Sequence, residues 1–409
     1  MPEGIDAFTA DGLTFGVRIS DGLVAVAAGD KEASARLVVR RLEQEVTTPT
    51  DPSRTTLDPG TETSSITLMV AQKCNLRCTY CYGVNGEYGS PGMLDFETAH
   101  AVIADFMGRA GTAERNINFF GGEPVLAMTA VRHLTYHALR LALHFDRLVS
   151  FSMTTNATLI TEEIAAWLAH HLFSVIVSID GDPALHGSNR PDALGRSSWE
   201  ATVRGARHLL RFLGPERILA RATLTAAYPE IEQILSNLRE IGLTRIALAS
   251  VEPSPRGTAG AWTPEEYKRY RSAIGELVSE NLHPGGRQLP WNPLQDTLEL
   301  LARGTRRDRA CGVGNNARAL SADGHLYPCH RYVGDARFQL GSEGSSRVDS
   351  QESGGSRFEE NRRRALEECQ SCVAKAFCAG GCAHVALQRS EFCSERRRRS
   401  SLRHFLRFI

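Results

Sequence analysis

The chain has 409 residues, too many for one ordinary domain and enough for two or three. Its 47 Lys and Arg residues balance 47 Asp and Glu residues, so net charge favours neither nucleic acid nor an anionic membrane as partner. The 42% hydrophobic and 23% charged residues are typical of a globular protein and exclude a disordered chain. No apolar run approaches the ~20 residues of a membrane span, and the N-terminus lacks the pattern of a secretory signal. We expect a cytoplasmic protein with no membrane partner.

The first 60 residues predict a β-β-α element followed by a linker. Two short apolar runs, Leu13–Ile19 and Gly22–Ala27, meet at a Ser-Asp-Gly turn, and Glu32–Glu45 has a helical period. Thr47–Ser64 is rich in Thr, Pro, Ser and Asp, a composition typical of a linker.

Residues 64–255 alternate between strand-like and helix-like segments. The apolar runs of strand length are Ile66–Val70, Ile117–Phe120, Leu148–Met153, Phe173–Ile179, Ile218–Leu224 and Ile246–Val251. The amphipathic segments with a helical period are Phe96–Met107, Glu162–His171, Trp199–Phe212 and Glu230–Ile241. Strand–helix units in series predict an α/β fold whose parallel sheet has helices outside it. The period alone does not decide whether that sheet closes as a barrel.

Polar signatures follow these strands where each one ends. They are Cys74 after the first, Gly121–Glu123 after the second, Thr154–Asn156 after the third, Ser178–Asp180 at the fourth, and Arg221 within the fifth. Because parallel α/β folds bind ligands at the carboxyl ends of their strands, we expect these groups on one face.

The ten cysteines fall into two groups. Three lie in KCNLRCTYCYG, and the others are Cys311, Cys329, Cys369, Cys372, Cys378, Cys382 and Cys393. A cytosolic chain rarely uses disulfides, so this number favours metal or redox chemistry over a set of buried free thiols. The grouping indicates two metal-binding regions.

The first group has the spacing Cys74-x3-Cys78-x2-Cys81 and supplies three thiolates. A cubane iron–sulfur cluster takes four ligands, so three cysteines leave one iron open to a small molecule. Zinc usually takes four protein ligands from paired motifs, and no fourth Cys or His lies nearby in the sequence. The spacing therefore favours an iron–sulfur cluster.

CNLRCTYC and the GGEP segment at Gly121–Pro124 resemble two motifs of the radical S-adenosylmethionine (SAM) family. The resemblance implies a partial (β/α)6 TIM-like barrel in which Cys74, Cys78 and Cys81 hold a [4Fe–4S] cluster that binds SAM. It also implies cleavage of SAM to a 5′-deoxyadenosyl radical, with reduced flavodoxin or ferredoxin as electron donor.

The resemblance assigns further residues to SAM. They are Gly121, Gly122 and Glu123 for its amino group, Tyr80 for adenine, Asn156, Ser178 and Asp180 for ribose, and Arg190 or Arg221 for its carboxylate. The glycines allow close approach of backbone to a ligand, and arginine matches a carboxylate. Turn chemistry or surface ion pairs are the alternative explanation for the last five.

The seven later cysteines resemble the SPASM domain of radical SAM enzymes that mature peptides and proteins. The two resemblances together cover about residues 64–395 and imply two auxiliary [4Fe–4S] clusters. Cys369, Cys372, Cys378 and Cys393 would ligate the outer one, and Cys311, Cys329 and Cys382 the inner one. Some relatives carry another cysteine where this chain has Ala317, which leaves the inner cluster one cysteine short. A substrate thiolate, or a water, histidine or carboxylate, would complete it.

His330 follows Cys329, where the sulfatase maturases that the chain resembles carry an aspartate base. A histidine can deprotonate a substrate near neutral pH, or it can donate a hydrogen bond to a cluster sulfur. The segment CYGVNGEYG, Cys81–Gly89, is more similar to maturases that form thioethers and other cross-links.

We therefore expect an enzyme that cross-links a ribosomally synthesised precursor peptide, with a thioether favoured and a C–C or C–O bond as alternatives. Formylglycine-type oxidation of a Cys or Ser in a protein is the second reading. A zinc-stabilised, non-catalytic binding module is the third. A nucleic-acid-modifying radical enzyme fits the neutral charge poorly.

The expected domains follow this order. Residues 1–60 form an N-terminal element that is either a shortened leader-peptide-binding region or a cap on the barrel, and 64–255 form the radical SAM barrel. Residues 256–310 form a bridging region, 311–395 the SPASM domain with a mobile loop at Gly341–Ser356, and 396–409 a solvated basic tail.

Overall fold

The computed structural model describes residues 5–10, 13–18, 24–28, 64–109, 114–226, 231–251 and 317–342, with isolated residues elsewhere up to 387. The chain divides into two units, which are residues 60–263 with 312–360, and residues 1–59 with 264–311 and 361–409. Most of the expected helix Glu32–Glu45, the bridging region and the tail 396–409 lie outside the described residues. In the described part, no helix is long and apolar enough to cross a membrane.

The N-terminal segment forms a three-stranded antiparallel sheet of β1 (Ile5–Ala10), β2 (Leu13–Arg18) and β3 (Val24–Ala28). The sequence predicted the last two strands but not β1. Its residues IDAFTA mix polar and small side chains, which leaves too weak an alternation to indicate a strand by itself.

The larger unit is built on six parallel strands that follow one another in the sheet, as expected for the α/β fold. They are β4 (Ser64–Ala71), β5 (Glu114–Gly121), β6 (Leu148–Thr155), β7 (Ser174–Ser178), β8 (Ile218–Leu224) and β9 (Ile246–Ser250). Phe119 of β5, Phe151 of β6 and Phe173, the residue before β7, are buried and stack with ring centroids 5.3–6.4 Å apart. Every strand that the sequence predicted in this unit is present.

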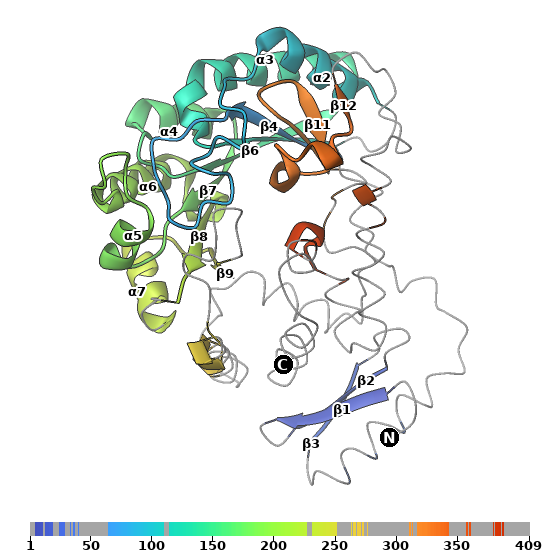
Figure 1. The fold of residues 1–409 in the computed structure, drawn as a ribbon, viewed down its shortest axis with the longest axis vertical. Coiled ribbons are helices and arrows are strands. Elements are labelled where there is room, and N and C mark those ends of the chain that lie inside the picture. The colour runs from blue at the N-terminus through green and yellow to red at the C-terminus, as the bar shows by residue number, and fades with distance from the viewer. Residues whose placement is uncertain are drawn as a thin grey trace. The chain divides into compact units, whose positions relative to one another are not determined.

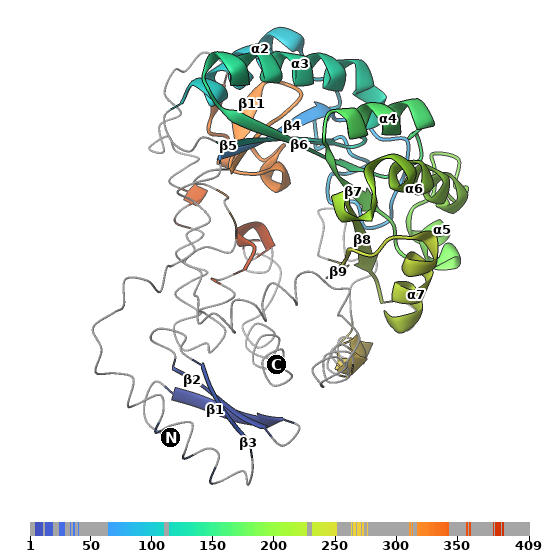
Figure 2. The same ribbon diagram turned by 180° about the vertical axis from the view of Figure 1, so that it is seen from behind.

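Six α-helices lie along the outside of this sheet (Figures 1 and 2). They are α2 (Phe96–Gly108), α3 (Met128–His144), α4 (Glu162–His170), α5 (Pro183–Asn189), α6 (Trp199–Leu213) and α7 (Ile231–Ile241). The side chains of Asp95, Thr161 and Asp182 cap α2, α4 and α5, each accepting a hydrogen bond from a backbone N–H in the first turn. The sequence predicted neither α3 nor α5.

Three short strands near the C-terminus extend the same sheet beyond β4. They are β10 (Ala317–Leu320), β11 (His325–Tyr327) and β12 (Gly341–Ser342), and β10 pairs with β4 in parallel. Residues 312–360 thus group with the barrel, and not with the rest of the segment expected at 311–395. The side chain of buried Gln72 links the loop between β4 and α2 to the turn after β10. Its Nε2 donates to the Ser90 carbonyl at 2.7 Å, and its Oε1 accepts from the Ala322 N–H at 2.6 Å.

Candidate active site

The loop of residues 72–95 between β4 and α2, called the cluster loop below, carries Cys74, Cys78 and Cys81. All three thiols are free and partly exposed. They lie close enough to interact electrostatically, since burial raises the pKa of Cys74 to about 12 and Glu123, Cys78 and Cys81 contribute to the rise. Burial likewise raises the pKa of Cys78 to about 11, against the opposing charge of Arg190. Metal binding would displace the protons from these thiols, so the loop would supply three thiolate ligands.

The thiol of Cys74 is already surrounded by hydrogen-bond donors. The Leu76 N–H donates to its Sγ at 3.4 Å, and Nδ2 of Asn156, at the end of β6, donates at 3.8 Å. Asn156 also donates to Oδ1 of Asn75 at 2.9 Å. Hydrogen bonds to cysteine sulfur tune the reduction potential of an iron–sulfur cluster. The donor set thus suits a [4Fe–4S] cluster held by three cysteines.

Gly121 and Gly122, at the end of β5, lie directly against the cluster loop. The N–H of Gly122 donates to the Ala71 carbonyl at 2.7 Å, and the N–H of Glu123 donates to the Lys73 carbonyl at 2.9 Å. A Cβ on Gly121 would lie 2.2 Å from the Ala71 oxygen, and one on Gly122 would lie 2.3 Å from the Lys73 oxygen. The sequence predicts that these glycines let the backbone approach SAM closely. In the structure, the atoms that leave no room for a side chain belong to the backbone just before Cys74.

The Gly122→Ala substitution should disrupt cluster assembly. The added methyl group cannot share space with a backbone carbonyl, so the cluster loop must move, at a cost of about 1–3 kcal/mol by analogy with overpacked cores. We expect clearly less iron per chain after anaerobic reconstitution. Gly92→Ala is the matched control in the same loop, because its Cβ would meet only Cβ of Ala322 at 3.8 Å. Equal iron content in the two variants would contradict this steric account.

Glu123 is fully buried, and its carboxylate accepts three hydrogen bonds from the protein. Its Oε1 accepts from the Val125 N–H at 3.1 Å and from the Thr155 hydroxyl at 2.7 Å, and its Oε2 accepts from the Asn156 N–H at 2.7 Å. Burial raises its pKa to about 7, while these three bonds favour the ionised form. The carboxylate therefore joins the ends of β5 and β6, and its expected bond to the SAM amino group stays a prediction.

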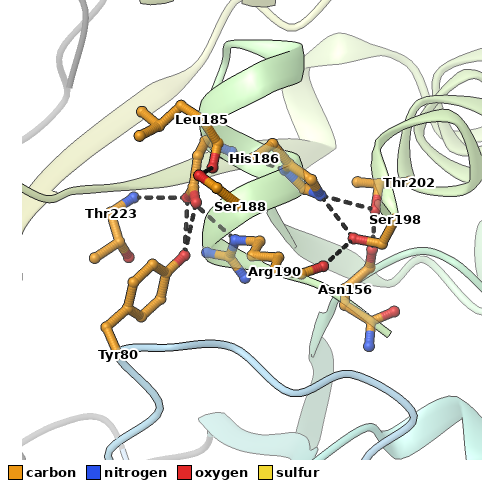
Figure 3. Close-up of polar contacts among 10 residues, drawn as sticks. Tyr80, Asn156, Leu185, His186, Ser188, Arg190, Ser198, Thr202 and Thr223 are labelled. Carbon is orange, nitrogen blue, oxygen red and sulfur yellow. Dashed lines mark hydrogen bonds and ion pairs between the residues drawn. The ribbon is translucent and has the colours of Figure 1, made fainter. Parts of the chain in front are cut away.

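Three residues expected to contact SAM bind one another (Figure 3). The carboxylate of fully buried Asp180 accepts from the Tyr80 hydroxyl at 2.8 Å, from Nε of Arg190 at 3.1 Å and from the Thr223 N–H at 3.1 Å. The Arg190 guanidinium also lies 5.2 Å from the centre of the Tyr80 ring. These contacts fix Tyr80, which lies between two of the cluster cysteines.

Arg221 is the better suited of the two arginines for an incoming carboxylate. Arg190 already has Asp180 as its partner, whereas the Arg221 side chain is exposed on β8 beside Ser178 of β7. Partial desolvation and the nearby Arg331 guanidinium lower the pKa of Arg221. An anion between these two cations would be stabilised electrostatically.

His330 lies beside one residue next to the glycine pair Gly121–Gly122 and one residue next to the cysteine motif. It begins the 3₁₀ turn His330–Tyr332 after Cys329, and its ring centroid is 4.6 Å from that of Phe120 and 6.2 Å from that of Tyr82. Phe120 precedes the glycine pair, and Tyr82 follows Cys81. The next residue, Arg331, lies 5.0 Å from the centre of the Tyr82 ring, and its N–H donates to Sγ of Cys329 at 3.3 Å.

The auxiliary-cluster ligands are only partly described. Cys311 and Cys382 are exposed residues of the smaller unit, and Cys329 belongs to the larger one. The outer-cluster ligands Cys369, Cys372, Cys378 and Cys393 lie outside the described residues. Both ligand sets therefore stay predictions.

Sequence reasoning missed His186 and Ser198, which bind the backbone of Asp180 and Arg190. The Asp182-Pro183 pair is a capping residue followed by a favoured first helical residue, and it would have indicated α5, the helix that carries His186. Nothing local indicates Ser198, whose contacts depend on the tertiary fold.

Comparison with known proteins defines the class. Residues 68–219 match the family model of the radical SAM superfamily. This segment is a radical SAM domain, and the chain is an enzyme whose cofactors are a [4Fe–4S] cluster and SAM. The interpretation as a zinc-stabilised, non-catalytic module is therefore wrong.

Sulfatase-maturating enzymes are among the similar proteins. The chain is 24% identical over 322 residues to a cysteine-type anaerobic sulfatase-maturating enzyme of Clostridium perfringens, covering 76% of this chain and 85% of that one. It is 28% identical over 145 residues to the radical SAM cyclopropyl synthase TigE of Paramaledivibacter caminithermalis, covering 32% of this chain and 30% of that one. The solved structure of anSMEcpe with bound AdoMet and Cp18Cys peptide has the same fold, with a TM-score of 0.65 at 21% identity over 79% of this chain and 89% of that one.

Proposed function

We propose that this enzyme modifies a ribosomally synthesised precursor peptide and forms an intramolecular cross-link in it, with a thioether favoured over a C–C or C–O bond. The observation that carries the proposal is the position of His330, whose ring packs against Phe120 and lies near Tyr82. The sulfatase maturases that resemble this chain carry an aspartate at the position of His330. A neutral imidazole suits a substrate thiol, because it accepts the thiol proton near neutral pH.

The reaction class fixes the balance of atoms. Joining a cysteine sulfur to a carbon removes one hydrogen atom from a C–H bond and one proton and one electron from the S–H group. Cys74, Cys78 and Cys81 would hold the cluster that, with SAM, supplies the 5′-deoxyadenosyl radical as hydrogen-atom acceptor. His330 would take the proton. The electron would pass to the auxiliary cluster for which Cys311, Cys329 and Cys382 are the proposed ligands.

The orientation of SAM is assigned to residues at the strand ends. Arg221, with Ser178 beside it, would bind the methionine carboxylate, and the backbone at Gly121–Glu123 would bind the amino group. Asn156 would contact ribose, since it already lies beside Cys74 and Asn75. Reduced flavodoxin or ferredoxin is the proposed electron donor.

The decisive measurement is the mass of a short peptide encoded beside this gene, after anaerobic co-expression with the enzyme. We expect a loss of two hydrogen atoms per site and a cysteine that no longer reacts with an alkylating reagent. The same loss with an alkylatable cysteine would move the bond to carbon or oxygen. His330→Ala should retain SAM cleavage without peptide yet form at least about tenfold less product, the lower part of the range for a lost general base. An unchanged yield would remove His330 from the reaction.

Formylglycine-type oxidation is the second candidate, and similarity to the sulfatase-maturating enzyme favours it. It would convert a Cys or Ser side chain into an aldehyde and form no ring. A hydrazide reagent that labels the modified substrate would therefore support oxidation and exclude the cross-link.

A further inference from the structure

A closed ring of hydrogen bonds lies beside the cluster loop (Figure 3). The Asp180 N–H donates to Nδ1 of His186 at 3.3 Å, and Nε2 of His186 lies 3.0 Å from Oγ of Ser198. The Ser198 hydroxyl donates to the Arg190 carbonyl at 2.6 Å, and Nε of Arg190 donates back to the Asp180 carboxylate at 3.1 Å. These four residues, called the Asp180 ring, are all less than 7% exposed.

The contacts of His186 determine where its proton lies. Nδ1 accepts from a backbone N–H, so it carries no proton, and Nε2 must carry the proton that is donated to Ser198. Burial, with a contribution from Arg190, lowers the pKa of His186 to about 4, so the imidazole is neutral at pH 7. Nε2 also lies 3.5 Å from the Thr202 hydroxyl, which donates to the Asn156 carbonyl at 3.1 Å. His186 therefore orients its neighbours and does not change its protonation state near neutral pH.

The segment that the ring fixes is the one to which the cluster loop is hydrogen-bonded. The N–H of Arg77 donates to the Pro191 carbonyl at 2.7 Å, and the N–H of Thr79 donates to the Asn189 carbonyl at 2.9 Å. Arg190 lies between these two acceptors, and its own carbonyl is bonded to Ser198. A displacement of Arg190 would thus shift the loop on both sides of Cys78.

Side chains also connect the Asp180 ring to the cluster loop. The Tyr80 hydroxyl binds the Asp180 carboxylate, so the ring contacts the loop between Cys78 and Cys81 as well. Arg190 lies near enough to Cys78 to oppose the rise in the pKa of that thiol. The charge and the position of Arg190 therefore both act on the residues that hold the cluster.

We propose that His186 is a positioning residue for the SAM-binding cluster, which fixes Asp180 and Arg190 and through them the cluster-loop segment 77–80. The proposal depends on the enzyme being a radical SAM protein and is independent of the peptide substrate. The hydrogen-bond partners of the His186 imidazole among the described residues are Asp180, Ser198 and Thr202, so it acts on the cluster loop through Arg190, Tyr80 and the backbone bonds to Arg77 and Thr79.

The test compares His186→Leu with His186→Gln in the full-length, anaerobically reconstituted protein. The electron paramagnetic resonance spectrum of the reduced cluster is recorded with and without SAM, and 5′-deoxyadenosine is measured without peptide. In His186→Leu we expect the KM for SAM to rise at least about tenfold and the spectral change on SAM addition to weaken, because two hydrogen bonds are lost. His186→Gln retains an acceptor and a donor, so we expect it to restore most of the response.

Leu134→Ala is the control for a general loss of stability, since Leu134 is buried in α3 and contributes no atom to the ring. Its SAM response should stay that of the parent protein. Ser198→Ala removes one hydroxyl and should give an intermediate SAM response. It replaces His186→Leu as the test variant if His186→Leu does not fold. A parental response in His186→Leu and Ser198→Ala would overturn the proposal. So would equal losses in the His186 and Leu134 variants at matched stability. Neither readout needs a peptide, so failure of the cross-linking experiment leaves this inference standing.

Discussion

Glu123→Gln should destabilise the fold even when no SAM is bound. Each carboxylate oxygen accepts from a buried donor, and a glutamine has only one acceptor oxygen, so its NH₂ group must face an N–H or O–H donor. Leaving a buried donor unpaired costs about 1–3 kcal/mol, and the loss of charge-assisted bonds adds to this. We expect the free energy of unfolding in urea to fall at pH 8, where Glu123 is mostly ionised, but by less than the sum of these costs, because glutamine also removes the buried charge whose desolvation raises the pKa of Glu123 to about 7.

The same experiment separates two roles for Glu123. If its carboxylate mainly binds the SAM amino group, Glu123→Gln would weaken SAM binding while leaving the SAM-free protein as stable as the parent. Glu163→Gln is the control, since Glu163 is exposed on α4 and pairs with Arg132 at 2.7 Å. Exposed ion pairs contribute about 0–1 kcal/mol, so this change should have a small effect.

Asp180→Asn should have the second large effect, because it removes one charge of a buried ion pair. Asp180 is fully buried, and the Arg190 side chain is 7% exposed. Removing one partner of such a pair typically costs about 3–5 kcal/mol, since the other charge is left buried without compensation. The asparagine keeps the shape and one acceptor oxygen, so the loss reports the charge. We expect unfolding at a correspondingly lower urea concentration and a weaker SAM response of the cluster.

The double variant Asp180→Asn/Arg190→Gln tests this explanation. With both charges removed, the double variant should lose less stability than the sum of the two single changes. Additive losses would show that the two side chains act independently. Asp105→Asn provides a surface comparison, because Asp105 pairs with Arg109 in the exposed part of α2. Its effect should be about 1 kcal/mol or less.

Most of the barrel could be predicted from the sequence because its strands carry apolar residues at alternate or successive positions. Ile218–Leu224 was expected and found with the same bounds, and its first, third, fifth and seventh residues are buried. Helix α3 was missed although Ala130, Leu134 and Ala138 bury one face at four-residue spacing. Histidine, arginine and threonine on its other positions diluted that pattern.

The candidate site was predictable in its location and less so in its contacts. The motifs indicated Cys74 and Gly122, whose part in binding the cluster and SAM stays a prediction, and the neighbour that restricts residue 122 to glycine is a carbonyl from another strand end. The contact of Asp180 with ribose likewise stays a prediction, and no local pattern indicated its hydrogen bonds to Tyr80 and Arg190. Such partners come together only through tertiary packing, which a local pattern does not record.

The pairing of β10 with β4 also has a consequence for the order of folding. The hydrogen bond from Ala322 to Gln72 joins residues 250 positions apart, so it cannot form until most of the chain has left the ribosome. Contacts between such distant residues form late, because the entropy of closing the intervening loop must be overcome first. Until then the edge of β4, which leads directly into the cluster loop, is open to pairing with other strands. We expect the cluster to be inserted after translation, once β10 has paired with β4 and completed the sheet on that side.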